Sequence, residues 1–218
     1  MAYTPTPATT AARHQERISY DEALAHEVLD STVFCSVATV VGGLPRVLPQ
    51  LHVRRGSVLH LHASSGATTS LAARDGGVDV SVAVSQPLAL VLARSAMHHS
   101  IDSRSVVVAG RAVPVTDPAE KRAVLAALVD AVAPGRSAQC RPPTERELAM
   151  VGVLALPLVT VSVKVRAHGA VDDDADLALP HWAGRVPLRL VAGEYEPAPD
   201  LHPDIPAPPR HPLQLAVT

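Results

Sequence analysis

LPRVLPQLHVRRGSVLHLHAS spans residues 44–64, and this stretch decides the fold class. It divides before Gly56 into two segments rich in Val, Leu and His, which have the length and composition of β-strands. The preceding segment, residues 33–41, is β-branched and ends in a pair of glycines, which is a turn signal. We therefore predict three consecutive antiparallel strands, with Pro45 and Pro49 placing the second strand at an edge or on a bulge.

Strand-like segments resume downstream and are separated by few helices. They cover residues 78–85, 88–93, 104–116, 151–167 and 182–193. Helical patterns cover residues 19–31, a short segment before residue 77, and residues 117–134, while Thr144 and Glu147 have the spacing of a capping box. Many short strands with few helices predict a mainly β protein with flanking helices, an α+β β-barrel and not a doubly wound α/β fold.

Length and composition define the class of the chain. At 218 residues, with 47% hydrophobic and 2% aromatic residues, it has enough Val, Leu and Ala for one domain. We predict a disordered tail at residues 1–17, the domain at residues 18–195 and a Pro-rich tail at residues 196–218.

Charge and hydropathy indicate which partners to exclude. The formal net charge of −2 gives no electrostatic reason to expect nucleic-acid or membrane binding. The N-terminus lacks the apolar core of a secretory signal, and no apolar run is long enough to span a membrane. Cys35 and Cys140 form no framework of known spacing. We expect a cytoplasmic protein.

The first candidate site is HLHASSGATTS, residues 60–70. His60 and His62 lie two apart on a strand and therefore project from the same face. A hydroxyl-rich loop then opens a helix, where free backbone N–H groups and hydroxyls can bind phosphate. The alternative is an ordinary Ser/Thr cap beside partly exposed histidines.

The second candidate site lies in RSAMHHSIDSRSVVVAG, residues 94–110. If the chain is extended there, His98 and His99 point in opposite directions, so only one of them faces a given pocket. Arg104 precedes a buried strand and is either an anion clamp or a surface side chain with a buried stem.

Two features near the C-terminus have structural interpretations. Trp182 is the only tryptophan, and such a residue is usually in the core, although it can also stack on a planar ring. The acidic run at residues 172–174 is interpreted as a solvated loop. A metal site built from His60, His62 and either His52 or His98 has loose spacing, and we expect none.

Together, these segments resemble the FMN-binding split-barrel family related to pyridoxamine 5′-phosphate oxidase, in its flavin-nucleotide-binding branch. The resemblance covers residues from about 20 to 203, and its most distinctive parts are HHS followed by RSVVV, and KVR followed by WAG. It implies a six-stranded split β-barrel that forms a homodimer, with FMN at the dimer interface and a small-molecule substrate. The function implied is that of an FMN-dependent oxidoreductase.

The resemblance also implies which residues hold FMN. The phosphate would lie against the loop after the third strand, and a second polar wall would follow the fifth strand. The cofactor-binding residues implied are His62, Ser64, Ser65, Thr68, Thr69, His98, His99, Ser100 and Arg104. Relatives usually carry a basic residue where this chain has Thr68 or Thr69, and Arg46, Arg54, Arg55 or Arg74 would have to replace that charge.

Two alternatives follow from this departure and from the eleven histidines of the chain. One is a haem-binding split barrel whose axial ligand is His60, His62, His98 or His99. The other is a non-catalytic flavin-binding or regulatory protein that keeps the fold without turnover.

Overall fold

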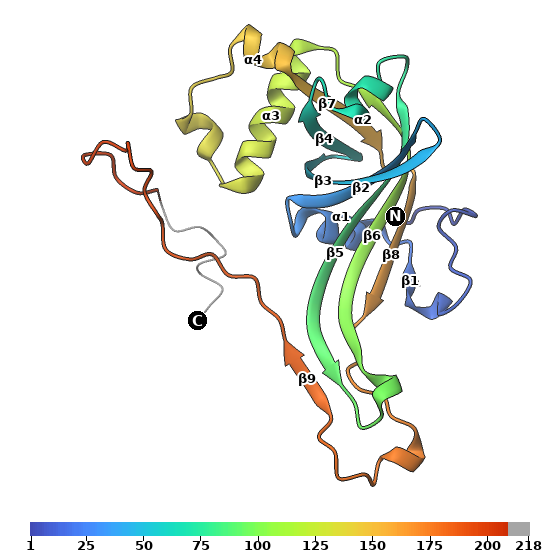
Figure 1. Cartoon of the computed structure of the whole chain (residues 1–218). Coiled ribbons are helices and arrows are strands. Elements are labelled where there is room, and N and C mark those ends of the chain that lie inside the picture. The colour runs from blue at the N-terminus through green and yellow to red at the C-terminus, as the bar shows by residue number, and fades with distance from the viewer. Residues whose placement is uncertain (209–218) are drawn as a thin grey trace.

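The computed structural model describes residues 1–208 and contains a nine-stranded sheet that closes on itself. The strand order is β1-β8-β6-β7-β4-β3-β2-β5-β9, and the additional pairing of β5 with β6 closes a ring of six strands (Figure 1). The strands are β1 (Ile18–Ser19), β2 (Phe34–Val41), β3 (Leu44–Arg55), β4 (Val58–Ser64), β5 (Val78–Leu92), β6 (Ser100–Pro114), β7 (Val151–Pro157), β8 (Thr160–Arg166) and β9 (Gly184–Pro187). The predicted mainly β fold with a six-stranded split barrel is confirmed.

Short helices connect and cover the strands. They are α1 (Glu22–Asp30), α2 (Thr68–Ala72), α3 (Pro118–Val132) and α4 (Glu145–Met150), with 3-10 turns η1 (Gln15–Arg17), η2 (Ala96–His98), η3 (Arg136–Gln139) and η4 (Asp174–Asp176). The predicted capping box is present, because the Glu147 N–H donates to the Thr144 hydroxyl and the Thr144 N–H donates to the Glu147 carboxylate. It begins α4 immediately before β7.

Three strand assignments differ from the sequence prediction. The segment expected at residues 182–193 is a strand only over β9. The segments expected at residues 78–85 and 88–93 form one strand, β5, because the irregularity at Pro87 is absorbed as a register shift against β6. The single strand expected at residues 151–167 is instead two strands, β7 and β8, which are separated at Leu158 and Val159.

The prolines of β3 fall where the strand has one hydrogen-bonded neighbour. Residues 44–50 pair with β2 alone, and the pairing of β3 with β4 begins at Leu51. Pro45 and Pro49 therefore lie in a section with one open edge, where a missing N–H does not interrupt a ladder. The edge alternative of the sequence prediction is correct.

Two hydrophobic clusters stabilise the molecule. The larger fills the barrel with valines and leucines from its strands, together with Ala25, Val28 and Leu29 of α1. The smaller lies on the outer face of β3, β4 and β7, where Val124 and Leu128 of α3 pack against Val153. The sheet therefore buries both faces at β4.

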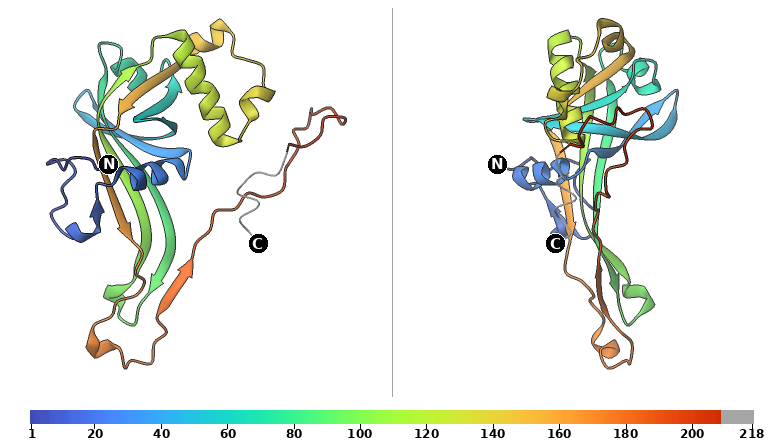
Figure 2. Two further views of the ribbon diagram at one scale, coloured as in Figure 1. Left: turned by 180° about the vertical axis from the view of Figure 1, so that it is seen from behind. Right: turned by 90° about the vertical axis from the view of Figure 1, so that its left-hand side faces the viewer.

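β5 and β6 extend beyond the barrel as a long hairpin (Figures 1 and 2). Its end carries η2, and the segment between β8 and β9 folds beside it before β9 pairs with β5. We call residues 94–100 and 168–183 together the tip. The tip is distant from α2 and α3, which lie at the opposite end of the barrel.

The N-terminal and C-terminal segments lie outside the six-stranded ring. Residues 1–17, assigned by composition to a disordered tail, make defined contacts: Thr9 is buried and its carbonyl accepts a hydrogen bond from the Tyr20 hydroxyl. After β9 the chain runs apart from the barrel and returns toward η3 (Figure 2). Part of the predicted Pro-rich tail, residues 209–218, lies outside the described residues. Within residues 1–208, no helix is long and apolar enough to cross a membrane.

Candidate functional site

His60 and His62 project from the outer face of β4 toward the α3 side. Their neighbours Leu59 and Leu61 belong to the barrel core, so alternation along the strand turns both imidazoles outward. The residues paired with them across the sheet are apolar: Val53 and Ala155 beside His60, and Leu51 and Val153 beside His62. All four belong to, or pack against, the cluster under α3. We call this region the α3 face.

Burial keeps both imidazoles neutral near pH 7. Burial lowers the pKa of His60, and the nearby Arg55 guanidinium lowers it further. Burial also lowers the pKa of His62, which is half-buried. The Nδ1 atom of His60 is buried and has no hydrogen-bond partner among the described residues, while its Nε2 lies 4.0 Å from a carboxylate oxygen of Glu120. A neutral imidazole with a free nitrogen can bind a metal centre.

His52, on β3, has a structural role. Its side chain is buried, and its Nε2 lies 2.9 Å from the backbone oxygen of Leu29, to which it donates. The hydrogen bond ties β3 to the end of α1. Burial lowers the pKa of His52, so this donor also stays neutral.

The β4–α2 loop carries the predicted phosphate ligands. The Ser65 N–H donates to the Met150 carbonyl at 3.0 Å, and the Gly66 N–H reaches the Ser64 hydroxyl at 3.3 Å. Ser64 is exposed, Ser65 and Thr68 are half-buried, and Thr69 is buried. The hydroxyls of Ser64, Ser65 and Thr68 are thus open to a ligand, whereas Thr69 is buried.

Close packing against β7 fixes the position of α2. A Cβ at Gly152 would lie 2.5 Å from the hydroxyl oxygen of Ser70, so glycine is needed for the two segments to approach. Ser70 is buried and its hydroxyl has no partner among the described residues.

The second predicted wall lies at and near the tip. His98 ends η2, and the exposed His99 has its Nδ1 3.0 Å from the Ser95 backbone oxygen. Ser100 begins β6. The guanidinium of Arg104 is held by the Gln86 amide oxygen at 2.6 Å and by the Glu27 carboxylate. Within this chain, Arg104 therefore already has an anionic partner.

The two predicted walls do not meet within one chain. The β4–α2 loop lies beside the Pro114 end of β6, since Ser64 pairs with Val151 and the Val115 N–H donates to Val153. His98 lies at the other end of β6, which has 15 residues. That length corresponds to about 45 Å of strand.

The arginines considered as replacement cations differ in availability. Arg54 forms a bidentate pair with Asp30, with distances of 2.9 and 2.5 Å. Within residues 1–208, Arg46, Arg55 and Arg74 make no ion pair. These three are the cations that remain free for a phosphate.

The structure corrects two interpretations of the C-terminal region in part. Trp182 is exposed and lies over Gly184, where a Cβ would be 2.7 Å from the indole ring, so it is not a core residue. The acidic run is only partly solvated. The side chain of Asp172 is 1% exposed, because its carboxylate accepts hydrogen bonds from the Arg94 side chain and from the N–H groups of Arg94 and Ser95.

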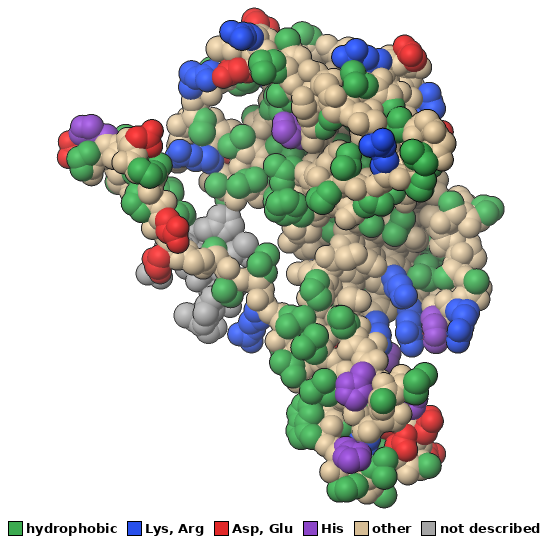
Figure 3. All heavy atoms as spheres, viewed as in Figure 1, with side chains coloured by type: hydrophobic (Ala, Val, Ile, Leu, Met, Phe, Trp, Pro, Cys, Tyr) green, Lys and Arg blue, Asp and Glu red, His purple; other side chains and the backbone are tan. Residues whose placement is uncertain are grey.

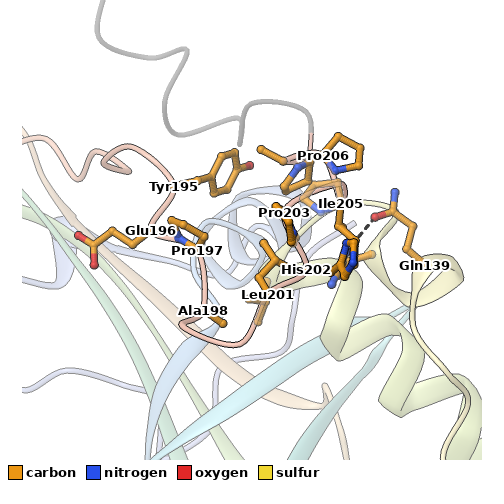
Figure 4. Close-up of a pocket in the computed structure, with 16 residues that line it drawn as sticks. Gln139, Tyr195, Glu196, Pro197, Ala198, Leu201, His202, Pro203, Ile205 and Pro206 are labelled. Atoms are coloured by element: carbon orange, nitrogen blue, oxygen red, sulfur yellow. Dashed lines mark hydrogen bonds between the residues drawn. The ribbon is translucent and has the colours of Figure 1, made fainter.

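A cavity of about 1000 Å³ separates the C-terminal segment from the end of α3 and from η3 (Figure 4). Its lining is largely apolar and includes Val132, Tyr195, Leu201 and Ile205, with His202 as its imidazole. No sequence signal indicates this cavity, because its two walls come from segments about 60 residues apart with no shared motif. It also missed Glu120, whose proximity to His60 depends on how α3 packs.

Comparisons with known proteins agree with this geometry. The family model described as pyridoxamine 5′-phosphate oxidase matches residues 21–165. The flavocytochrome Anf3 from Azotobacter vinelandii is 32% identical, with a TM-score of 0.89 and 98% of each chain covered. The FAD and heme binding protein from Mycobacterium smegmatis is 33% identical, with a TM-score of 0.84, and the match covers 88% of this chain and 94% of that one. No curated protein matches the chain.

Proposed function

The chain belongs to the pyridoxamine 5′-phosphate oxidase family, and from this premise we propose that it is a redox protein that binds both a flavin and a haem. The observation that carries the proposal is its 32% identity to a flavocytochrome over 98% of both chains. The sequence analysis treated FMN and haem as alternatives. The Mycobacterium smegmatis relative, an FAD and heme binding protein, supports binding of both cofactors by one chain.

The α3 face offers the donors and the apolar surroundings that a haem needs. It combines apolar side chains with two neutral imidazoles, one of which has a buried nitrogen without a partner. We propose His62 as the axial ligand, because it is half-buried and accessible, whereas His60 is enclosed and lies beside Glu120. At the tip, His98 has acidic neighbours instead of an apolar wall, and His99 faces the Ser95 carbonyl.

The flavin site is assigned to the β4–α2 loop. Ser64, Ser65 and Thr68 offer hydroxyls to a phosphate, and Arg74 follows α2 without an ion-pair partner among the described residues. The sequence analysis expected FMN, but the Mycobacterium smegmatis relative is described as binding FAD. A flavin supplies hydride and single-electron transfer, and a haem supplies one-electron and oxygen chemistry.

A homodimer is part of the proposal. Apolar side chains are exposed along β2 and β3, among them Phe34, Val40, Leu44 and Val47, each more than 60% exposed. A patch of this kind is unusual on a monomer, and a second copy would cover it. A second copy would also allow His98 and Ser100 of one protomer to approach the β4–α2 loop of the other, since the two walls lie apart in one chain.

The visible spectrum of the purified full chain tests the proposal. Bands of oxidised flavin together with a Soret band are expected, and chromatography of the released flavin separates FMN from FAD. A protein that shows neither a flavin spectrum nor a Soret band after incubation with FAD, FMN and haemin would overturn the proposal. Light scattering at micromolar concentration tests the dimer, for which a monomer would be the contradicting result.

A further inference from the structure

We propose that the tip contains a divalent-cation site formed by His98, Asp173 and Asp176, with ligand chemistry suited to Zn²⁺. One donor atom from each of these residues lies within 4.8 Å of the other two. The donors come from η2 and from the segment around η4, which are more than 70 residues apart in sequence. Within one chain this site lies apart from the β4–α2 loop and the α3 face, so it can be tested without a bound flavin or haem.

The spacing of the His98 and Asp173 donors is close to that around a bound ion. The Nε2 atom of His98 lies 3.9 Å from a carboxylate oxygen of Asp173. Bonds of about 2.1 Å to a tetrahedral Zn²⁺ place two ligand atoms about 3.4 Å apart, so a small side-chain movement completes the arrangement. One imidazole and two carboxylates would leave a fourth position for water.

A buried carboxylate faces the other nitrogen of the same imidazole. Nδ1 of His98 has no hydrogen-bond partner among the described residues and lies 3.9 Å from an oxygen of Asp172. Asp172 is itself fixed by the backbone and guanidinium of Arg94. A carboxylate that faces Nδ1 favours the tautomer that leaves Nε2 free for a metal, which is the usual outer-shell arrangement around a histidine ligand.

The charge of the tip also favours a cation. The guanidinium of Arg94 forms an ion pair with the acidic run, through Asp172. Within the part of the chain that the structure describes, Asp173, Asp174 and Asp176 have no permanently charged partner. Figure 3 shows histidine and acidic side chains gathered at this end of the molecule. A divalent ion would offset their repulsion and link η2 to η4.

Calorimetric titration of the untagged full chain with Zn²⁺, after treatment with a chelator, tests the site. We expect saturable binding of one ion per chain and a higher midpoint of thermal unfolding with Zn²⁺. His98→Ala and Asp176→Asn should each weaken binding at least about tenfold, and Asp172→Asn should weaken it about 10- to 100-fold by releasing the imidazole.

His99→Ala is the matched control. His99 is adjacent in sequence, but its Nδ1 faces the Ser95 carbonyl instead of the acidic run, so the variant should bind Zn²⁺ like the unaltered chain. Absence of saturable binding, or binding that His98→Ala leaves unchanged, would overturn the site. Equal losses in His98→Ala and His99→Ala would also do so.

Discussion

The molecule carries two pairs of histidines in opposite surroundings. On the α3 face, His60 and His62 lie among Leu51, Val53 and Val153. At the tip, His98 and His99 lie on a short turn, and His98 faces two aspartates. The residue type is the same, but the surroundings differ. Those of the first pair suit a haem, and those of the second suit a small hydrated cation.

The two regions are also held together differently. The α3 face depends on apolar packing by Val124 and Leu128. The base of the tip depends on Asp102, a fully buried carboxylate that pairs with Arg166 and with Arg185 and accepts from the Gly169 N–H. Removing atoms from an apolar cluster lowers the free energy of unfolding in proportion to the cavity created. Removing one partner of a buried ion pair lowers it strongly, because the other charge is left buried and unpaired.

The largest expected effect is at the base of the tip. Asp102→Ala leaves the guanidinium of Arg166 without its anion in a mostly buried position, which should lower the free energy of unfolding by about 3–5 kcal/mol. Denaturant titration measures the change. Asp79→Ala removes an exposed pair with Arg111 and should cost at most about 1 kcal/mol. Equal losses in the two variants would contradict a structural role for the buried network.

A smaller loss is expected on the α3 face. Leu128 is buried under α3, and Leu128→Ala should lower the free energy of unfolding by about 2–4 kcal/mol. The neighbouring Val129 is exposed, so Val129→Ala should change it by about 0.5 kcal/mol or less. Haem content after purification should fall in Leu128→Ala while flavin content stays constant. A parallel loss of both cofactors would place the haem elsewhere.

The smallest effect is a dependence of stability on pH. Burial lowers the pKa values of His52 and His60 in the folded chain, while the unfolded chain has values near about 6.5. As the pH falls through about 6.5, these histidines bind protons in the unfolded state before they do so in the folded state. The free energy of unfolding is therefore highest above this pH and decreases on acidification. Unfolding curves of the cofactor-free chain between about pH 7.5 and about pH 5.5 should show this decrease. The free energy of unfolding should depend less steeply on pH in His60→Gln. A rise in stability on acidification would contradict the assignment of His52 and His60 as buried neutral imidazoles.

The sequence predicted the features that depend on local pattern. Alternation along residues 58–64 placed His60 and His62 on one face, and the Thr144–Glu147 spacing predicted the capping box. The merging of two segments into β5 was not predicted, because Pro87 is a local signal for a break and only the pairing with the next strand, β6, carries the strand across it.

The candidate site was predictable in its parts but not in their arrangement. The pairing of Arg104 with Glu27 joins residues 77 positions apart, and no local motif indicates it. The burial of Asp172 likewise depends on Arg94, whereas composition alone favoured a solvated loop. The separation of the two polar walls follows from the length of β6.

The central claim is that the α3 face, and not the tip, provides the haem ligand. The most direct measurement is the visible spectrum of four separate variants, His60→Ala, His62→Ala, His98→Ala and His99→Ala, each reconstituted with haemin and flavin. We expect that His62→Ala abolishes or strongly shifts the Soret band while its flavin bands remain, and that His98→Ala and His99→Ala retain both. A Soret band unchanged in His62→Ala but lost in His98→Ala would contradict it.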